Sequence, residues 1–416
     1  MKQEVKLKQT EIGMIPEDWE IGTLSNIATF KNGKKSPERD NSEQYFVWGS
    51  NGIIGKSNKT NAQAKTNIIG RVGSYCGSVY YSKEKCWVTD NAIIAEPKDN
   101  SYSEFLFYLL KRLNLHQHRG GSGQPLLNQT TLNNIKIPLP KKDEQKKIAK
   151  ILSDLDSKIE ILQQKNKTLE RIGKILFKEW FVDFEFLTDK GKPYNSSGGE
   201  LVESELGMIP EDWKIKELQE FIDVQKGLSY KGKHLVESEG LPMANLGTFK
   251  PLKGFKPEGI KFYDGEHKER HLIKQGDMLI ANTDITQKRD VLGSPAIIPK
   301  NIGAEKIIFT HHTFAVRPKL NYLPTLFIYY LLQTPNYRNR ARGFAIGTTV
   351  LALPKEAVLE LKFVCAPKNL LDNFDKFVKP LFVETENNNE EIESLSKTRD
   401  LLLPKLMSGK IRVMSQ

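Results

Sequence analysis

The seven-residue sequence GMIPEDW occurs twice in this chain, at residues 13–19 and again at residues 207–213. The residues that follow the two copies are almost wholly different. A chain of 416 residues is too long for one compact core. The duplicated frame therefore predicts two domains of related architecture, one behind each copy.

Positive charge is concentrated in the blocks behind the two frames. The net charge is +11, with 15 Lys/Arg against 8 Asp/Glu in residues 31–140 and 21 against 12 in residues 226–365. Concentrated basic side chains most often neutralise phosphates, so these blocks favour two contact surfaces for a polyanion. Solvated surfaces with surplus lysine are the alternative.

Both blocks repeat one order of predicted elements. Strand-like runs come first, then an aromatic-rich helix, then a glycine-containing loop. These segments are residues 66–81, 103–113 and 119–128 in the first block and residues 276–285, 324–333 and 342–353 in the second.

A long helix is predicted to follow each block. From Asp143 to Phe181 apolar residues recur at heptad spacing, with Lys158 and Lys165 interrupting the seam. A weaker copy runs from about residue 371 to residue 407, with Asn388 in its seam. The predicted pairing residues are Ile148, Ile151, Leu155, Leu162, Leu169, Ile172, Leu176, Phe374, Phe377, Leu381, Leu395 and Leu402. The two helices most simply pair with each other; packing on their own blocks or on another protein is the alternative.

The sequence contains no recognisable catalytic or metal-binding motif, and its histidine and cysteine spacings do not match known metal sites. What recurs in the basic blocks is side chains whose donors and acceptors match base edges or phosphates. The candidate DNA-contacting residues are Lys34, Lys35, Asn51, Lys56, Arg71, Tyr75, His118, Arg119, Ser122, Gln124, Lys231, Lys233, Asn282, Thr283, Gln287, Lys288, Arg289, Arg338, Arg340 and Arg342.

A cytoplasmic location is expected. No apolar run is long enough to span a bilayer, and the first residues lack the apolar core of a signal peptide. Cys76, Cys86 and Cys365 form no disulfide framework, which agrees with a reducing compartment.

The ordered set of motifs resembles the specificity subunit of type I restriction-modification enzymes. The matching pieces are the GxIPxxW frame, VWGSNGIIGKS, NIIGRVGS, GSVYYSKEKCWVTDNA, IPLPKKDEQKKIAKIL at residues 137–152, LFKEWFVDFEF at residues 176–186 and the terminal LLLPKLMSGKI. The second repeat departs from the pattern, because CAPKNLLDNFDKF lacks the pair Glu144 and Gln145 of the first.

The resemblance implies a mixed α/β fold with two target recognition domains, two long antiparallel coiled-coil helices and approximate two-fold symmetry. The expected divisions are residues 1–140, 141–186, 187–365 and 366–416, with the first and third holding the recognition domains. Each domain would read one half of a split, asymmetric sequence in double-stranded DNA, and the helices would set the gap.

The same resemblance implies a non-catalytic subunit without cofactors of its own. It would recruit two modification subunits, which methylate adenine N6 with S-adenosylmethionine, and restriction subunits that use ATP and Mg²⁺. A bivalent protein-binding adaptor and a stand-alone DNA-modifying enzyme are the alternative hypotheses.

Overall fold

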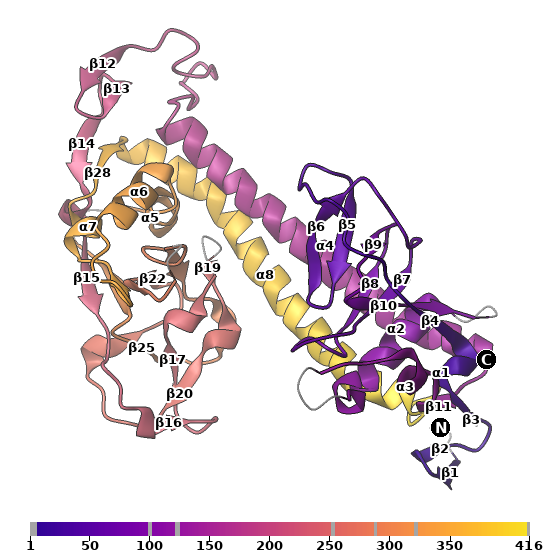
Figure 1. The fold of residues 1–416 in the computed structure, drawn as a ribbon. Helices are drawn as coiled ribbons and strands as arrows, with labels where there is room; N and C mark the ends of the chain where they lie inside the picture. Colours follow the sequence, from indigo (N-terminus) through magenta and orange to yellow (C-terminus); the bar gives the residue numbers. More distant parts are fainter. Residues whose placement is uncertain are drawn as a thin grey trace. The chain divides into compact units, whose positions relative to one another are not determined.

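The structure is a computed structural model that describes residues 6–98, 102–120, 125–250, 254–286, 289–319 and 323–413. The chain divides into a first unit, Met1–Leu162 with Glu391–Gln416, and a second unit, Gln163–Glu390. Two long helices, α4 (Lys142–Phe181) and α8 (Lys368–Met407), contribute to both units (Figure 1). The predicted class, a duplicated mixed α/β chain with two long helices, is confirmed.

The strands and shorter helices of the first unit are β1 (Leu7–Thr10), β2 (Gly13–Pro16), β3 (Glu20–Thr23), α1 (Leu24–Ile27), β4 (Ala28–Asn32), β5 (Tyr45–Gly49), β6 (Gly52–Ser57), β7 (Thr66–Gly70), β8 (Val79–Ser82), β9 (Trp87–Val88), β10 (Ala92–Pro97), α2 (Ser103–Arg112), α3 (Gln129–Asn133) and β11 (Lys136–Leu139). Those of the second unit are β12 (Leu201–Ser204), β13 (Gly207–Pro210), β14 (Lys214–Glu217), β15 (Ile222–Lys226), β16 (Leu235–Val236), β17 (Leu241–Ala244), β18 (Phe249–Lys250), β19 (Gly254–Phe255), β20 (Lys261–Tyr263), β21 (Leu272–Ile273), β22 (Met278–Ala281), β23 (Thr283–Asp284), β24 (Pro295–Ile297), β25 (Ile307–Phe309), β26 (Thr313–Pro318), α5 (Thr325–Leu331), α6 (Pro335–Gly343), β27 (Leu351–Ala352), α7 (Glu356–Leu359) and β28 (Lys362–Cys365).

The two units share one strand order. The main sheet runs β4-β10-β7-β8 in the first unit and β15-β26-β22-β24 in the second, with antiparallel neighbours throughout. A further sheet places β5 between antiparallel β6 and parallel β9, and its counterpart places β17 between antiparallel β20 and parallel β25. In the second unit β16 and β21 extend this sheet. The duplication seen in the frame therefore extends to the topology.

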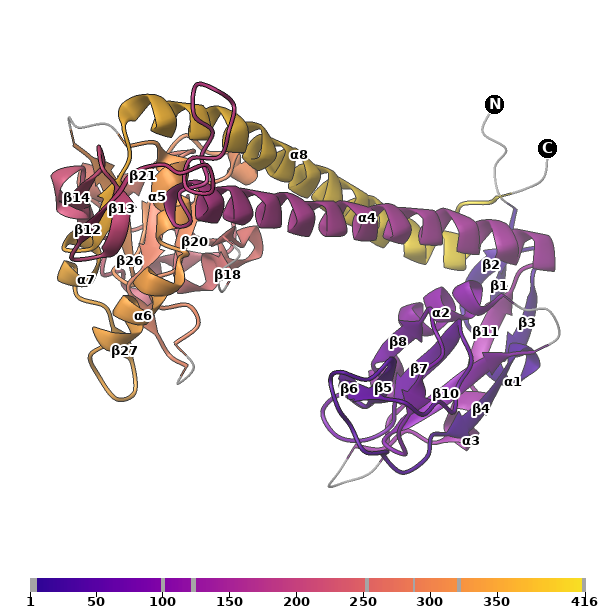
Figure 2. The same ribbon diagram turned by 90° about the horizontal axis from the view of Figure 1, so that it is seen from above.

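In the first unit, α2 lies between the main sheet and the start of α4 (Figure 2). Its Phe105 and Leu109 are buried in one cluster with Ile93 of β10 and with Ile148 and Leu152 of α4. The helix predicted at residues 103–113 is confirmed. It anchors α4 on the sheet through apolar burial.

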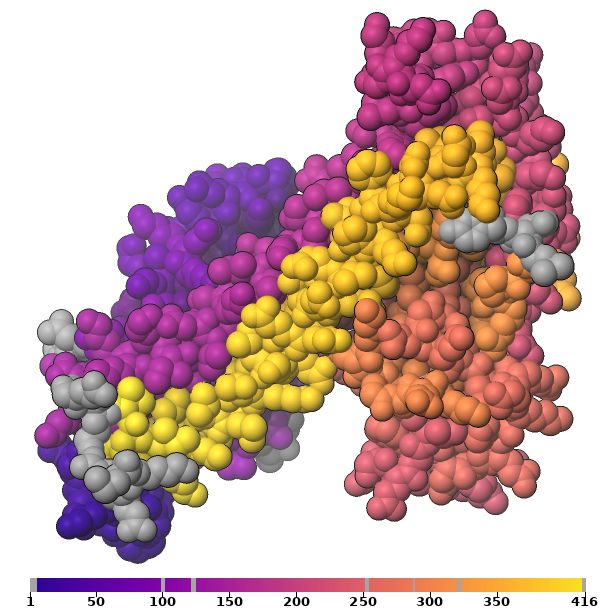
Figure 3. All heavy atoms as spheres, turned by 180° about the vertical axis from the view of Figure 1, so that it is seen from behind, coloured from indigo at the N-terminus to yellow at the C-terminus, as the bar shows by residue number. Residues whose placement is uncertain are grey.

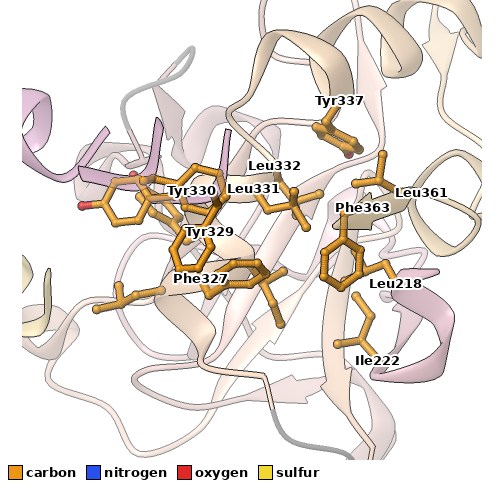
Figure 4. Packing of buried hydrophobic residues seen from close by; sticks show 14 of the residues in the cluster. Leu218, Ile222, Phe327, Tyr329, Tyr330, Leu331, Leu332, Tyr337, Leu361 and Phe363 are labelled. Carbon is orange, nitrogen blue, oxygen red and sulfur yellow. The ribbon is translucent and has the colours of Figure 1, made fainter. Parts of the chain in front are cut away.

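In the second unit, α5 takes the corresponding place and is buried from Leu326 to Leu331. Figure 4 shows its aromatic side chains in one apolar cluster with residues of other segments. These include Leu218, in a short 3-10 helix, and Phe363 of β28. A helix that is apolar all round belongs in a core. α4 approaches it closely, because a Cβ at Gly173 would lie 2.0 Å from the hydroxyl of Tyr330.

The two long helices are antiparallel and lie against each other (Figure 3). In the first unit Arg399 of α8 donates to Asp156 of α4 at 2.7 Å. In the second unit Phe374, near the start of α8, meets Phe181, at the end of α4, with ring centroids 5.0 Å apart. The predicted pairing of the helices with each other is thus confirmed. None of the described helices is long and apolar enough to cross a membrane.

The buried seam of α4 differs from the predicted one by one position. The expected seam residue Ile172 is 39% exposed, and Ile151 packs partly buried in the first unit's core. The seam instead uses the residues that follow them in helical order: Leu152, Ile159, Asn166, Gly173 and Trp180. Phe377 of α8 is 59% exposed, although its ring meets that of Trp180 edge-on at 5.7 Å.

Lysines explain this shift of the α4 seam. Lys158 and Lys165, which seemed to interrupt the heptads, flank the seam and pair with Glu391 and Glu384 of α8. A lysine at a flanking position keeps its ammonium in water while its stem covers the seam. The polar interruption is thus an interhelical charge pairing.

A polar layer interrupts the apolar seam near its middle. Asn388 is 3% exposed and its amide donates to the side-chain oxygen of Asn166 at 2.7 Å. Asn166 in turn donates to Asn389 at 2.9 Å. A buried amide pair in a coiled coil fixes register at a cost in stability, because any slip leaves the amides unpaired.

We predict that Asn388→Leu destabilises the helix pair by about 1–3 kcal/mol, because it leaves the Asn166 amide without its partner. The double variant Asn166→Leu with Asn388→Leu should recover stability and lose register specificity. Urea denaturation followed by circular dichroism measures the first effect. Asn387→Ala, at an exposed position of α8, is the matched control. An Asn388→Leu variant as stable as this control would contradict the role of the layer.

The first frame docks on the start of α4 through a charged network. Trp19 is 1% exposed and its indole donates to Glu144 at 2.9 Å. Arg412, beyond the end of α8, donates to Glu144 at 2.8 Å and to both carboxylate oxygens of Asp18 at 2.8 Å. The hydrogen bonds from Arg412 hold the pKa of Asp18 below its usual value. The frame tryptophan thus packs where the first unit's strands join the long helices.

The second frame docks through aromatic packing. Trp213 is 5% exposed and stacks on Phe186 with ring centroids 5.1 Å apart, while Phe184 meets it edge-on at 5.5 Å. Leu370, at the third position of α8, holds the place that Glu144 has in α4, and it lies in the same apolar cluster as Trp213. The missing Glu-Gln pair is therefore replaced by leucine, and the docking is conserved in position while it changes in chemistry.

We predict that Arg412→Met destabilises the first unit by about 3–5 kcal/mol, because the buried Glu144 carboxylate loses its charged partner. Hydrogen exchange of amides in β7 and β10 should speed up, while exchange in β22 and β26 stays unchanged. Arg412→Lys, which keeps the charge and loses the forked geometry, should have a smaller effect. If amide exchange in β7 and β10 of Arg412→Met were no faster than in the parent protein, the stabilising role of the network would be refuted.

Candidate nucleic-acid interface

A glycine 14 residues after each frame, Gly33 or Gly227, lets two backbone segments touch. A Cβ at Gly33 would lie 2.2 Å from the carbonyl oxygen of Thr89, and a Cβ at Gly227 would lie 2.3 Å from that of Phe309. No other residue fits so close to a backbone. The two glycines therefore mark the same place in the two units.

The next residues repeat one backbone hydrogen-bond pattern. Lys34 donates to the carbonyl of Val88 at 3.0 Å, and Asp90 donates back to Lys34 at 2.9 Å. In the second unit Leu228 donates to Phe309 at 2.8 Å, and His311 donates back to Leu228 at 2.9 Å. Lys34 and Leu228 are therefore structural equivalents, as are Asp90 and His311.

The pattern continues directly after β7 and β22, which are inner strands of the two main sheets. Arg71 donates its backbone N–H to Asn91 at 2.9 Å and its guanidinium to the carbonyl of Asp90 at 2.9 Å. Asn282 likewise donates its backbone N–H to His312 at 3.0 Å and its amide to the carbonyl of His311 at 3.1 Å.

A returning loop closes both arrangements, because Leu127 donates to Arg71 at 2.9 Å and Leu353 donates to Asn282 at 2.7 Å. We call the two sites the first corner and the second corner. The first corner comprises Lys34, Arg71, Val72, Asp90, Asn91 and Leu127, and the second comprises Leu228, Asn282, Thr283, His311, His312 and Leu353.

The first corner brings several candidate residues together. Asn51 lies in the turn whose neighbour Ser50 donates to the carbonyl of Val72 at 2.6 Å. Tyr75 is 53% exposed in the turn that follows Val72. Arg119 leads into the segment where Gly120 and Leu126 exchange backbone hydrogen bonds at 2.9 Å. Basic, amide and aromatic groups thus share one edge of the first unit.

The remaining candidates of the first unit lie beside this corner or apart from it. Lys35 follows Lys34 in sequence, and His118 precedes Arg119. Lys56 lies on β6 with its ammonium 5.4 Å from the centre of the Phe46 ring. Ser122 and Gln124 lie outside the described residues.

The second corner is organised by a buried carboxylate. Asp284 is 1% exposed and accepts hydrogen bonds from the backbone and hydroxyl of Thr286 at 2.7 and 2.8 Å and from the backbone of Val291 at 2.9 Å. Burial raises the pKa of Asp284, but these hydrogen bonds outweigh it and the pKa lies below its usual value. The carboxylate thus holds both ends of a loop that exposes Ile285 and carries Arg289.

Other candidates of the second unit lie around this loop. Thr283 pairs with Ala352 in the β23–β27 ladder. Arg289 donates to the carbonyl of Arg342 at 2.7 Å. Lys231 and Lys233 are exposed around the turn Gly232–His234. Gln287 and Lys288 lie outside the described residues.

Three candidates have structural roles instead. Asn282 is 3% exposed, with its amide bonded to His311 as described. Arg338 is 5% exposed and donates to the carbonyls of Leu292 at 2.5 Å and Asp290 at 3.0 Å, and burial lowers its pKa. Arg340 donates to the carbonyl of Ala357 at 2.9 Å. Their hydrogen-bonding groups are used inside the protein, so we remove them from the candidate contacts.

Sequence reasoning missed the polar residues at the heart of each corner. Asp90 and Asn91 lie in the matched piece GSVYYSKEKCWVTDNA but are not among the candidates, and neither are His311 and His312, which lack metal-site spacing. The rings of His311 and His312 lie with centroids 3.9 Å apart and are tilted by 40° to each other. Burial lowers the pKa of His312, helped by His311 and Lys226. Within the described residues, no group of three His, Cys, Asp or Glu side chains could hold a metal ion.

We predict different effects for a buried and an exposed candidate arginine. Arg338→Met should destabilise the second unit by about 2–4 kcal/mol, because it leaves several buried carbonyls unpaired. Arg119→Met, at an exposed position, should leave stability unchanged and weaken polyanion binding. Thermal unfolding and heparin retention separate the two. Equal unfolding temperatures for both variants would contradict the buried role of Arg338.

The fold and the two corners together indicate one class of protein. Two similar mixed α/β units each present a polar corner within a basic block, and both units include parts of one antiparallel helix pair. Two equivalent surfaces with different side chains, each in a basic block, are typical of a protein that binds an extended polyanion through two domains.

Comparisons with known proteins give the family. Residues 16–171 match the type I restriction modification DNA specificity domain. The chain is 28% identical to the type I restriction enzyme MjaIX specificity subunit of Methanocaldococcus jannaschii, over 99% of this chain and 97% of that one. It is 27% identical to the MjaVIII specificity subunit of the same organism, over 96% and 94%. The crystal structure of the S subunit of a type I restriction-modification system from M. genitalium shares the fold with a TM-score of 0.61, at 18% identity, over 97% of this chain and 99% of that chain.

The chain carries a type I restriction modification DNA specificity domain at residues 16–171, and it is similar to specificity subunits over nearly its whole length. The description of the domain and the names of the relatives both indicate a role in DNA sequence specificity.

Proposed function

We propose that each unit reads one half of a bipartite, asymmetric sequence in double-stranded DNA through its corner, and that the paired helices set the gap between the halves. The observation that carries this proposal is the backbone hydrogen-bond pattern found once in each unit with different exposed side chains. The shared backbone geometry lets both units bind DNA in the same way, and their different exposed side chains suit the recognition of different base sequences. The basic surroundings suit its phosphates.

The proposed contacts follow from exposure. Arginine forks suit guanine edges, amides suit adenine, and apolar groups suit the thymine methyl. Ile285 and Ile346, 70% and 65% exposed beside the second corner, supply apolar groups of the last kind. The retained candidates are Lys34, Lys35, Asn51, Lys56, Arg71, Tyr75, His118, Arg119, Lys231, Lys233, Thr283, Arg289 and Arg342.

The proposed partners are two modification subunits and the restriction subunits of a type I complex, in the cytoplasm with the DNA. The names of the relatives, specificity subunits of type I restriction enzymes, support this assembly. S-adenosylmethionine, ATP and Mg²⁺ would be used by those partners. This chain would supply the choice of sequence.

Block exchange tests the division of labour. We predict that replacing residues 34–128 by the equivalent block of a relative, within the assembled methyltransferase, changes one half of the methylated sequence and leaves the other half and the gap intact. Sequencing of methylated adenines in a random DNA library gives the result. A change in both halves, or in neither, would falsify the modular proposal.

Salt dependence separates this function from a protein-binding adaptor. Binding through several phosphate contacts loses affinity steeply between 50 and 200 mM salt, roughly a thousandfold for six or more contacts. An adaptor held by apolar contacts would show no such loss. The intact complex and duplex DNA are the reagents for this measurement.

A further inference from the structure

We propose that Asn91 and His312 are specificity-determining residues that distinguish bases in the first and second halves of the target, and that Thr283 positions the His312 imidazole. This inference rests on the proposed function of the two corners. It assigns the choice of base to one equivalent position in each unit.

The equivalence of Asn91 and His312 is defined by the backbone. The backbone carbonyl of each accepts the N–H of the residue directly after an inner strand, Arg71 after β7 and Asn282 after β22, at 2.9 and 3.0 Å. Each follows the residue whose carbonyl accepts that partner's side chain. The main chain therefore delivers both side chains to the same place, and only the chemistry of the side chain differs.

The His312 ring is held in a defined orientation. Its Nδ1 lies 3.1 Å from the hydroxyl of Thr283, and the His311 ring lies against it at a tilt of 40°, with ring centroids 3.9 Å apart. Because Thr283 engages Nδ1, Nε2 is the ring nitrogen available to a base. The lowered pKa keeps the ring neutral near pH 7. A neutral, oriented imidazole offers one donor or one acceptor at a fixed point, which is what discrimination between base edges requires.

Asn91 offers a different pattern from the same position. Its amide is exposed and carries a donor and an acceptor side by side, the arrangement that matches adenine in the major groove. Beside it, Arg71 uses one guanidinium nitrogen on Asp90 and has further donors for a neighbouring contact. The two corners are thus built to prefer different bases without any change in backbone.

A hollow beside the second corner supplies a separate, sequence-independent contact. It has a volume of about 600 Å³ and borders His311, with Lys226 and Arg270 exposed on its lining. Its charge suits a backbone phosphate, which positions the DNA and does not select a base. Phosphate and base roles therefore fall on different residues within one unit, and mutations can separate them.

The test uses the assembled methyltransferase on a DNA library randomised across both half-sites. We expect His312→Ala to relax the preference at one base pair of the second half by about 5- to 150-fold, the range for loss of one base contact. Asn91→Ala should do the same in the first half only. Thr283→Val, which keeps the shape and loses the hydroxyl, should weaken the preference at the His312 base pair and nowhere else.

Arg270→Ala is the matched comparison. It should lower affinity for all sequences alike and reduce the salt slope by about one. His312→Gln keeps a polar group of similar reach, so it should shift the preferred base if His312→Ala fails to fold. Unfolding temperatures of all variants identify misfolded ones.

The inference is overturned if folded His312→Ala and His312→Gln complexes keep the parental preference, or if either alters the first half. It is also overturned if Arg270→Ala changes base preference in the way His312→Ala does. A successful block exchange together with unchanged preferences in these variants would reject this assignment alone. A failed block exchange would reject the proposed function itself.

Discussion

The docking of a tryptophan on the end of a long helix is the constraint on which both units depend. In the first unit Trp19 donates to Glu144, and the Arg412 guanidinium lies 5.8 Å from the centre of the indole ring. In the second unit Trp213 receives the ring of Phe186, which follows α4 at the same distance from its end as Arg412 follows α8. The frame tryptophan thus contacts a charged side chain, Arg412, in the first unit and an aromatic side chain, Phe186, at the equivalent position in the second. A frame of identical sequence therefore specifies a position and leaves its partner free to change.

The long helices and the buried frame could be predicted because they rest on local patterns. Heptad spacing, acidic residues in the first turn of α4 and a repeated Trp are visible in the sequence alone. The exact seam was not, because Lys158 and Lys165 occupy positions that a heptad count assigns to the interior. Only the partner helix shows that Glu391 and Glu384 receive them at the flank. Which face of a helix is buried is a property of the pair.

The candidate interface was predictable in kind and not in detail. Residue type alone predicts that arginines contact DNA. Arg338, however, donates its guanidinium hydrogen bonds to carbonyls inside the protein, whereas Arg119 is exposed. Composition cannot separate the two uses. Insertions also displace the equivalent residues by growing amounts along the chain, from Gly33 and Gly227 to Leu127 and Leu353. Hydrogen-bond partners reveal the correspondence because they do not depend on loop length.

This arrangement explains how recognition can change while the fold stays fixed. The hydrogen bonds that the two corners share run between backbone groups, which every residue except proline supplies in full. Side chains of Arg71, Asn282 and Thr283 add to them. The positions of Asn91 and His312 are set by such bonds, so a substitution there alters what the corner offers to a partner without removing a core contact. Extension of the second sheet by β16 and β21 leaves the same corner intact. The backbone atoms of Asn91 and His312 therefore stabilise the corners, while their side chains determine what each corner can bind. Because each unit has its own corner, one half of a target can change without the other.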